Sequence, residues 1–238
     1  MTKIKELVEH ITTSIVFEKS ILESEGLSPE IWDKYFSLGT SKTRKSGDYV
    51  FSIGDNISGI YFIKRGKIKG NFLGRDGNLK TFVIVGEGCT FGEQFVLHDQ
   101  PGLFEAVVVD DALLYYFDKD TMLDIMKRDF DINLFIIKSL AVKSRMLAVQ
   151  LEDMCLRNIL QSLCRILYSF CCYEEKNGEI AGDIVIPLSH QDLANMVGSH
   201  RVTITKNLAY LKKIGVLDYK YEKIFIKEKS KLKDIAFE

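Results

Sequence analysis

A long helix is predicted by the spacing of apolar residues between Ile132 and Met154, a stretch without glycine or proline. Six positions recur there at alternating steps of four and three residues: Ile136, Leu140, Lys143, Leu147, Gln150 and Met154. This heptad spacing is typical of a helix that packs against a partner helix. We therefore expect residues 129–154 to form a dimerisation helix.

Two positions of this seam are polar, and they allow two interpretations. Lys143 and Gln150 can fix the register and the oligomeric state, as polar residues in helical seams do. Alternatively, the Lys143 ammonium awaits an anion, because a buried cation without a partner is costly. The second interpretation predicts an anionic ligand beside the helix.

Before this helix, the spacing of apolar and polar residues is first typical of helices and then typical of β-strands. Residues 1–26 alternate apolar and charged side chains at helical spacing and predict an N-terminal helix of open role. Ser28 and Pro29 then suit the N-cap and first position of a short helix. The remainder of residues 27–128 is predicted to form a β-rich domain.

That domain is predicted from short β-rich runs separated by glycine turns between Ser41 and Phe117, a pattern typical of an all-β sandwich or barrel. Turns are expected at Arg65–Gly66 and, as a hairpin, at Asp76–Gly77. Asp110–Asp111 is predicted to be the tip of a further hairpin. A connecting helix at Thr121–Arg128 ends the domain.

Residues 155–238 are predicted to hold a helix-turn-helix with a wing. An amphipathic helix spans Arg157–Glu174, and a strand follows. Ser189 then caps a helix, Gly198 lies in the turn, and a second helix runs over Ser199–Lys213. A hairpin follows around Tyr219–Lys223. The inward positions are expected to be Leu193, Ala194, Val197, Val202, Leu208 and Leu211, with Ile204 partly so.

Composition narrows the class of protein. The 238 residues are 46% hydrophobic and 27% charged with a net charge of −1, which is ordinary for a soluble globular chain. No apolar run approaches a membrane span, and the N-terminus lacks a signal-peptide core, so we expect a cytoplasmic protein. The five cysteines suggest reduced thiols. Cys89, Cys155 and the Cys171–Cys172 pair leave a redox-sensing regulator as the alternative.

Positive charge is concentrated on one predicted element. The second helix of the helix-turn-helix carries Arg201, Lys206, Lys212 and Lys213 and no acid, which suits binding to phosphates of double-stranded DNA. The alternative is a winged helix used for protein contacts, with solvated lysines. The DNA-binding candidates are Ser189, His190, Gln191, Ser199, His200, Arg201, Val202, Thr203, Thr205 and Lys206.

At this point the chain resembles the cyclic-AMP receptor and fumarate–nitrate reduction regulator (Crp/Fnr) family. The motifs are KSGDYVFSIGD, YFIKRGKIK, GEGCTFGEQFVL and LSHQDLANMVGSHRVTITKNLAYLKK. The resemblance implies an α+β fold with an N-terminal β-roll, a long dimerisation helix and a C-terminal winged helix-turn-helix. It also implies a homodimer whose partners are DNA, a small effector and RNA polymerase.

Departures from the family pattern bear on the effector. Cyclic-nucleotide binders place an Arg and then Ser or Thr where this chain has Leu103 and Phe104, so cyclic AMP is not expected. No cysteine precedes Cys89, which disfavours an iron–sulfur cluster, and His98 does not suit haem. The four histidines have no metal-ligand spacing. We expect no cofactor.

The recognition segment is similar to that of the halorespiration regulators of this family, which respond to chlorinated phenols. Val202 replaces the usual acidic reader, as in those proteins, which prefer an AT-rich inverted repeat. Their dimer-helix lysine, which meets the phenolate, corresponds to Lys143. The effector-site candidates are Phe82, Gly92, Glu93, Leu103, Phe104, Leu140, Lys143 and Leu147. The sequence contains no nucleophile elbow, no metal-ligand spacing and no phosphate-binding loop, so we do not expect an enzyme.

Overall fold

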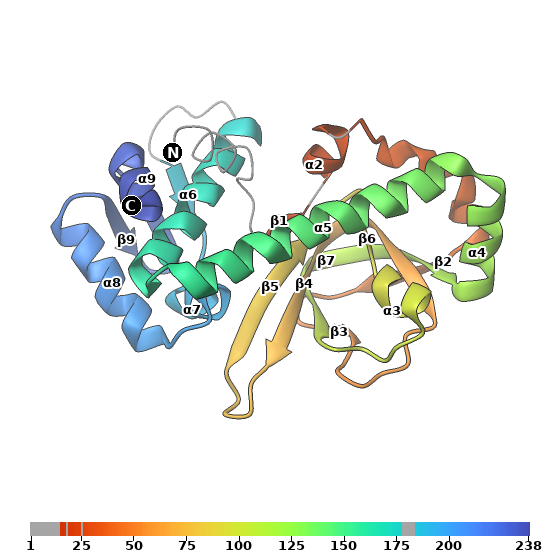
Figure 1. The fold of residues 1–238 in the computed structure, drawn as a ribbon, viewed down its shortest axis with the longest axis horizontal. Coiled ribbons are helices and arrows are strands. Elements are labelled where there is room, and N and C mark those ends of the chain that lie inside the picture. The colour runs from red at the N-terminus through yellow and green to blue at the C-terminus, as the bar shows by residue number, and fades with distance from the viewer. Residues whose placement is uncertain (1–14, 18, 25, 178–183) are drawn as a thin grey trace. The chain divides into compact units, whose positions relative to one another are not determined.

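The computed structural model of the chain describes residues 15–17, 19–24, 26–177 and 184–238. Contacts divide it into two compact units, one of Val16–Gly77 with Phe82–Arg145, and one of Met146–Glu238 with Ile15 and Asn78–Thr81. Figure 1 shows α5 (Phe130–Leu156) as one continuous helix. The division between the units falls within it, and its residues from Met146 onward belong to the second unit.

The first unit is organised around a seven-stranded sheet. Its neighbouring strands follow the order β1, β5, β4, β7, β2, while β3 adds to β7 and β6 adds to β4. The bounds are β1 Val16–Phe17, β2 Thr40–Arg44, β3 Tyr49–Phe51, β4 Gly59–Leu73, β5 Leu79–Val85, β6 Thr90–Phe91 and β7 Glu105–Asp118. The predicted hairpin at Asp76–Gly77 is confirmed, because β4 and β5 are neighbours and Gly77 has a φ of 80°.

Two predicted turns are instead parts of long strands. Arg65–Gly66 lies inside β4, where the pairing with β7 shifts register. Gly66 has a φ of 93°, and a Cβ there would lie 2.8 Å from the Ala112 Cα, so glycine permits an irregularity within the strand. Asp110–Asp111 lies inside β7, where the Asp111 carboxylate accepts a 2.7 Å hydrogen bond from Lys45 Nζ.

The N-terminal helix prediction is partly wrong. Residues 1–14 lie outside the described part of the chain, but Val16 and Phe17 form β1, which pairs in parallel with Ile84 and Val85 of β5. Periodicity alone cannot distinguish a helix from a strand in so short an apolar run, and here both side chains are buried in the sheet as parts of a strand. The helix that follows is short, α2 at Lys19–Ser24.

Aromatic packing closes one side of the sheet. A 3-10 helix, η1 (Pro29–Leu38), has Ser28 as N-cap and Pro29 in its first turn, as predicted. Its Trp32 is fully buried, with its ring centroid 5.3 Å from that of Phe62, 5.4 Å from Phe117 and 5.7 Å from Phe135 of α5. These contacts fix the N-terminal half of α5 against the sheet. Two further helices are α3 (Glu93–His98) and α4 (Lys119–Arg128).

The second unit contains the predicted winged helix-turn-helix. Its elements are α6 Ile159–Asn177, β8 Ile184–Ile186, α7 His190–Val197, α8 Arg201–Lys213, β9 Leu217–Lys220, β10 Lys223–Ile226 and α9 Lys229–Phe237. The three strands form an antiparallel sheet in the order β8, β10, β9. The terminal helix α9 was not predicted; it packs on α6 and buries Leu232 and Ala236.

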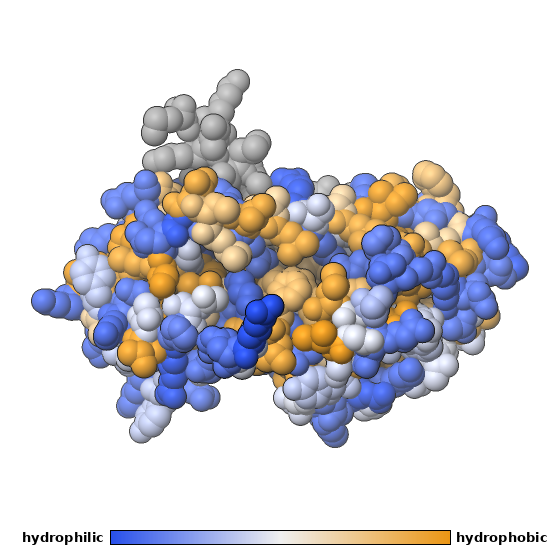
Figure 2. All heavy atoms as spheres, turned by 60° about the horizontal axis from the view of Figure 1, so that its bottom comes forward, coloured by the Kyte–Doolittle hydropathy of each residue, from blue (hydrophilic) through white to orange (hydrophobic). Residues whose placement is uncertain are grey.

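Both units expose apolar side chains. Figure 2 shows them interspersed with polar ones on the face drawn. No helix within the described residues is long and apolar enough to cross a membrane. The α+β class is as predicted, and so is the order of β domain, long helix and winged helix-turn-helix.

Candidate nucleic-acid interface and effector site

The turn between α7 and α8 is built by local hydrogen bonds. Ser189 and Asp192 form a capping box at the start of α7, in which each side chain accepts from the other's backbone N–H. Gly198 ends α7 in the left-handed region with a φ of 78°. The predicted cap and turn are both confirmed, and they set the direction in which α8 begins.

Helix α8 is anchored by one stripe and exposes another. Ile204, Leu208 and Leu211 are fully buried at the i, i+4, i+7 spacing of a core-facing stripe. Val202, predicted to face inward, is instead 66% exposed, and Ile204 takes the inward position. An exposed valine in the first turn of a recognition helix can contact a thymine methyl group.

Most predicted DNA-reading side chains share the exposed face at the start of α8. His200, Arg201, Thr205 and Lys206 are exposed, while Ser199 and Thr203 are half-buried. Lys212, further along, pairs with Asp218 of β9 at 2.5 Å. Arg201, Lys206 and Lys213 form no ion pair within the part of the chain that the structure describes, so their charge is available to phosphate.

His190 lies behind this face and connects three elements. Its Nδ1 lies 3.0 Å from Thr205 Oγ1 of α8, and its ring packs edge-on against Tyr219 of β9 with 5.1 Å between centroids. Burial, followed by the nearby Arg201 charge, lowers the pKa of His190. Gln191 is exposed and donates to Asn195 Oδ1 at 2.8 Å. His190 therefore contacts both α8 and the wing strand β9.

The seam of α5 differs from the predicted one. Ile136 is 1% and Gln150 6% exposed, and both face their own chain. Ile137, Leu147, Leu151 and Met154 are instead 60%, 45%, 62% and 71% exposed. The exposed stripe follows steps of three and four residues through Ile137, Leu140, Ser144, Leu147, Leu151 and Met154. The predicted seam shares Leu140, Leu147 and Met154 with it and is one residue off at the others.

Lys143 faces its own chain and already has an anionic partner. Its Nζ donates to the Thr90 carbonyl oxygen at 2.6 Å, forms an ion pair with Glu93, and lies 5.0 Å from the centroid of the Phe17 ring. The Lys143 side chain is 17% and that of Glu93 2% exposed. Glu93 begins α3 directly after Gly92, whose φ is 89°. The ammonium is thus sheltered, but not without a carboxylate.

The apolar residues predicted to line the effector site differ in how deeply they are buried. Phe82 and Phe104 are buried with ring centroids 4.7 Å apart, and Phe51, Phe72 and Phe95 complete an aromatic cluster around Phe104. Leu103 is 69% and Leu147 45% exposed, so neither lines a buried site in this chain. Leu140 is half-buried.

Three residues of this site were not predicted. Phe17 lies against the Lys143 ammonium, and the buried hydroxyls of Thr90 and Ser139 have no hydrogen-bond partner among the residues described. Ser139 precedes Lys143 by one helical turn, so its placement on the same face was available from the sequence. Nothing in the sequence marked Thr90 or Phe17, which reach α5 through strand pairing.

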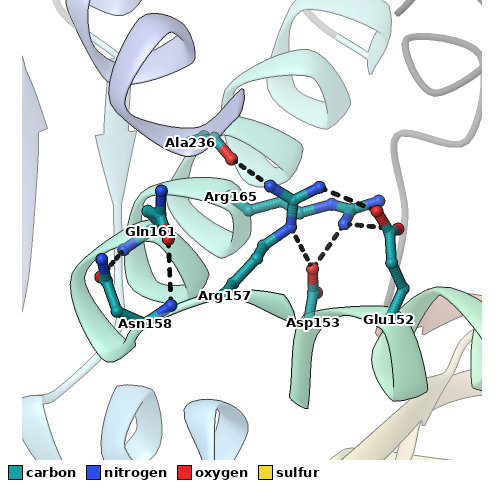
Figure 3. Close-up of polar contacts among 7 residues, drawn as sticks. All are labelled: Glu152, Asp153, Arg157, Asn158, Gln161, Arg165 and Ala236. Carbon is teal, nitrogen blue, oxygen red and sulfur yellow. Dashed lines mark hydrogen bonds and ion pairs between the residues drawn. The ribbon is translucent and has the colours of Figure 1, made fainter. Parts of the chain in front are cut away.

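At the end of α5, a charged cluster joins the helix to α6 and α9 (Figure 3). Asp153 Oδ1 accepts from Arg157 Nε at 2.8 Å and also pairs with Arg165, while Glu152 lies 3.1 Å from each arginine. Arg157 Nη1 donates to the Ala236 carbonyl oxygen at 2.8 Å. Burial raises the pKa of Asp153, against the opposing effect of the two arginines. The segment Asp153–Arg157 is thus bound to α6 and α9 by ion pairs and a hydrogen bond.

The thiols are mostly sheltered. Cys89, Cys164 and Cys171 are buried, Cys172 is half-buried, and Cys155 is exposed. Burial raises the pKa of Cys164 to about 12, which suppresses the thiolate that oxidation requires.

Comparison with known proteins assigns both units. Residues 42–129 match the cyclic nucleotide-binding domain, and residues 161–235 match the Crp-like helix-turn-helix domain. The chain belongs to the Crp/Fnr family of transcription regulators. As in that family, an effector-binding domain is joined to a DNA-binding domain.

Individual relatives agree with this assignment. The cyclic AMP receptor protein of Thermus thermophilus is 24% identical over 212 residues, which cover 89% of this chain and 95% of that protein. The solved structure of CprK complexed with OCPA is 25% identical, covers 85% of this chain and 93% of its own, and has a TM-score of 0.68. The solved structure of a CooA mutant from Carboxydothermus hydrogenoformans, at 16% identity over 87% of this chain and 94% of its own and with a TM-score of 0.74, shares the fold.

Proposed function

We propose that this Crp/Fnr regulator is a homodimer that binds a palindromic AT-rich operator when a small, anionic aromatic effector occupies the site beside Lys143. The observation that carries the proposal is the sheltered Lys143 ammonium, held between α3 and the sensing sheet by Glu93 and Thr90. The similarity to CprK, solved with OCPA, supports a non-nucleotide effector.

The residues at the cyclic-phosphate positions argue against cyclic AMP. Leu103 and Phe104 have no group that could neutralise a phosphate, and Phe104 packs among aromatic rings. An apolar pair suits an aromatic ligand and leaves a phosphodiester without its counter-ion. We therefore expect cyclic AMP to leave DNA binding unchanged.

Gating is proposed to be a shift in populations. An effector with higher affinity for one arrangement of the paired α5 helices favours that arrangement. Moving an equilibrium from 1:99 to 99:1 takes about 5.5 kcal/mol of differential binding, so each of two sites would supply about half. The exposed stripe of α5 is the proposed dimer contact, and RNA polymerase is the proposed partner on DNA.

The test is ligand screening by thermal shift with the purified full chain. Halogenated phenols and small aromatic acids are compared with cyclic AMP, because a ligand that binds the native state raises the melting temperature. The proposal expects a rise with at least one halogenated phenol and none with cyclic AMP. A rise with cyclic AMP alone would contradict it.

A further inference from the structure

The ion pair at the effector site is incomplete on both sides. Glu93 uses one carboxylate oxygen for Lys143, while its buried Oε2 has no hydrogen-bond partner among the described residues. The hydroxyls of Thr90 and Ser139 are in the same condition. Buried polar atoms are normally satisfied, so unsatisfied atoms on Glu93 and Thr90, the two residues that bind the Lys143 ammonium, indicate a polar ligand.

Charge decides how an anion can enter. Lys143 has three N–H donors and uses two of them, on the Thr90 carbonyl oxygen and on Glu93, so one donor remains for a ligand. However, a second anion beside Glu93 would leave two buried negative charges facing one ammonium. Burial of an uncompensated charge is costly, whereas exchange of one anion for another keeps the site neutral.

We propose that Glu93 is an internal counter-ion which the effector displaces. This inference rests on the proposed function. The anionic oxygen of the effector takes the place of the Glu93 carboxylate on Lys143, and the Thr90 and Ser139 hydroxyls donate to it. The Glu93 side chain then leaves α5, which releases the first turn of α3 from the long helix. Effector binding is thus read by α3 and α5 together, and the resident carboxylate sets the effector affinity.

The test compares Glu93→Gln with the wild-type full chain by calorimetric titration at about pH 8. The probes are 2,4,6-trichlorophenol, which is anionic there, and 2,4,6-trichloroanisole, its uncharged methyl ether. The glutamine keeps the shape and removes the competing charge, so it should bind the phenolate at least about tenfold more tightly. Binding of the ether should be unchanged. Glu87→Gln, which removes the same charge from an exposed position, should match the wild type.

Two additional variants make the outcome decisive. Glu93→Asp, whose shorter carboxylate reaches Lys143 less well, should also tighten phenolate binding and serves if the glutamine variant does not fold. The double variant Glu93→Gln/Lys143→Met removes both charges and should lose the phenolate preference. If the wild-type chain binds the phenolate and the Glu93 variants bind it equally or less tightly, the displacement of Glu93 is wrong but the proposed function stands. A wild-type chain that binds no halogenated phenol overturns the proposed function as well.

Discussion

At Lys143, a single ammonium group on α5 contacts three other elements of the first unit. It contacts Thr90 in β6, Glu93 in α3 and the Phe17 ring of β1. Because Glu93 is 1% exposed, loss of the cation would leave a carboxylate buried without compensation. Lys143 is therefore a structural residue as well as the proposed effector contact, so stability must be measured beside ligand response.

Lys143→Met should lower the free energy of unfolding by about 3 kcal/mol, because it breaks a buried pair from one side. Adding Glu93→Gln should recover most of that loss, since neither charge then remains. Urea denaturation at neutral pH measures both variants. A double variant that is less stable than Lys143→Met would show that the pair does not act as a unit.

Arg201→Ala should weaken operator binding by about 1–3 kcal/mol if the guanidinium reads a base, and should relax specificity at one position. Lys206→Ala should weaken binding to all sequences and reduce the salt slope by about one if it contacts phosphate. Fluorescence anisotropy over a salt series measures both effects. Lys231→Ala removes one exposed positive charge from α9, away from the predicted DNA-reading face, and as the matched control should leave operator affinity unchanged.

At the scale of elements, helices were predicted better than strands. The connecting helix, α5, α7 and α8 follow from periodicity and caps, because those signals are local. The length of β4, the placement of β1 and the contact of Thr90 with Lys143 depend on pairing between distant segments. The face of α5 was also misassigned, since both its buried and its exposed stripes are apolar and periodicity alone cannot choose between them.

Asp129 links the start of α5 to η1. It accepts from the Asp131 backbone N–H at 2.9 Å, from Tyr35 at 2.7 Å, and pairs with Lys34 at 2.6 Å. The Lys34 ammonium and then the Tyr35 hydroxyl lower the pKa of Asp129 to about 2. Because this pKa lies below its ordinary value, the stabilisation is present near pH 7 and is lost as the pH falls through the window from about 4 to about 2.

Asp129→Ala should therefore lower the free energy of unfolding near neutral pH by about 1 kcal/mol through loss of the helix cap. The difference from wild type should shrink as the pH falls from about 4 towards 2. Denaturation curves at several pH values measure it, with Asp131→Ala as the neighbouring control. A difference that stays constant over this pH range would assign no role to the carboxylate charge.

At the scale of the whole molecule, the proposed operator binding needs two copies of the chain. A helix-turn-helix dimer reads two half-sites about one helical turn of DNA apart, so operator symmetry follows from protein symmetry. The exposed apolar stripe of α5 has the spacing that a paired helix requires.

Leu151→Lys should dissociate the proposed dimer, because it places a charge within that stripe, where the leucine is 62% exposed in the single chain. Leu156→Lys makes the same change off the stripe, where the leucine is 77% exposed, and should leave the dimer intact. Sedimentation velocity distinguishes the two results. A dimer that persists in Leu151→Lys would place the contact elsewhere.

The most direct test of the account is the affinity of the full chain for an AT-rich inverted repeat, measured by fluorescence anisotropy with and without 2,4,6-trichlorophenol. We predict that the phenol tightens operator binding by at least about tenfold in the wild type, or roughly 1.4 kcal/mol. It should have no effect on Glu93→Gln/Lys143→Met. Equal operator affinity with and without the phenol in the wild type, or a response retained in the double variant, would contradict the account.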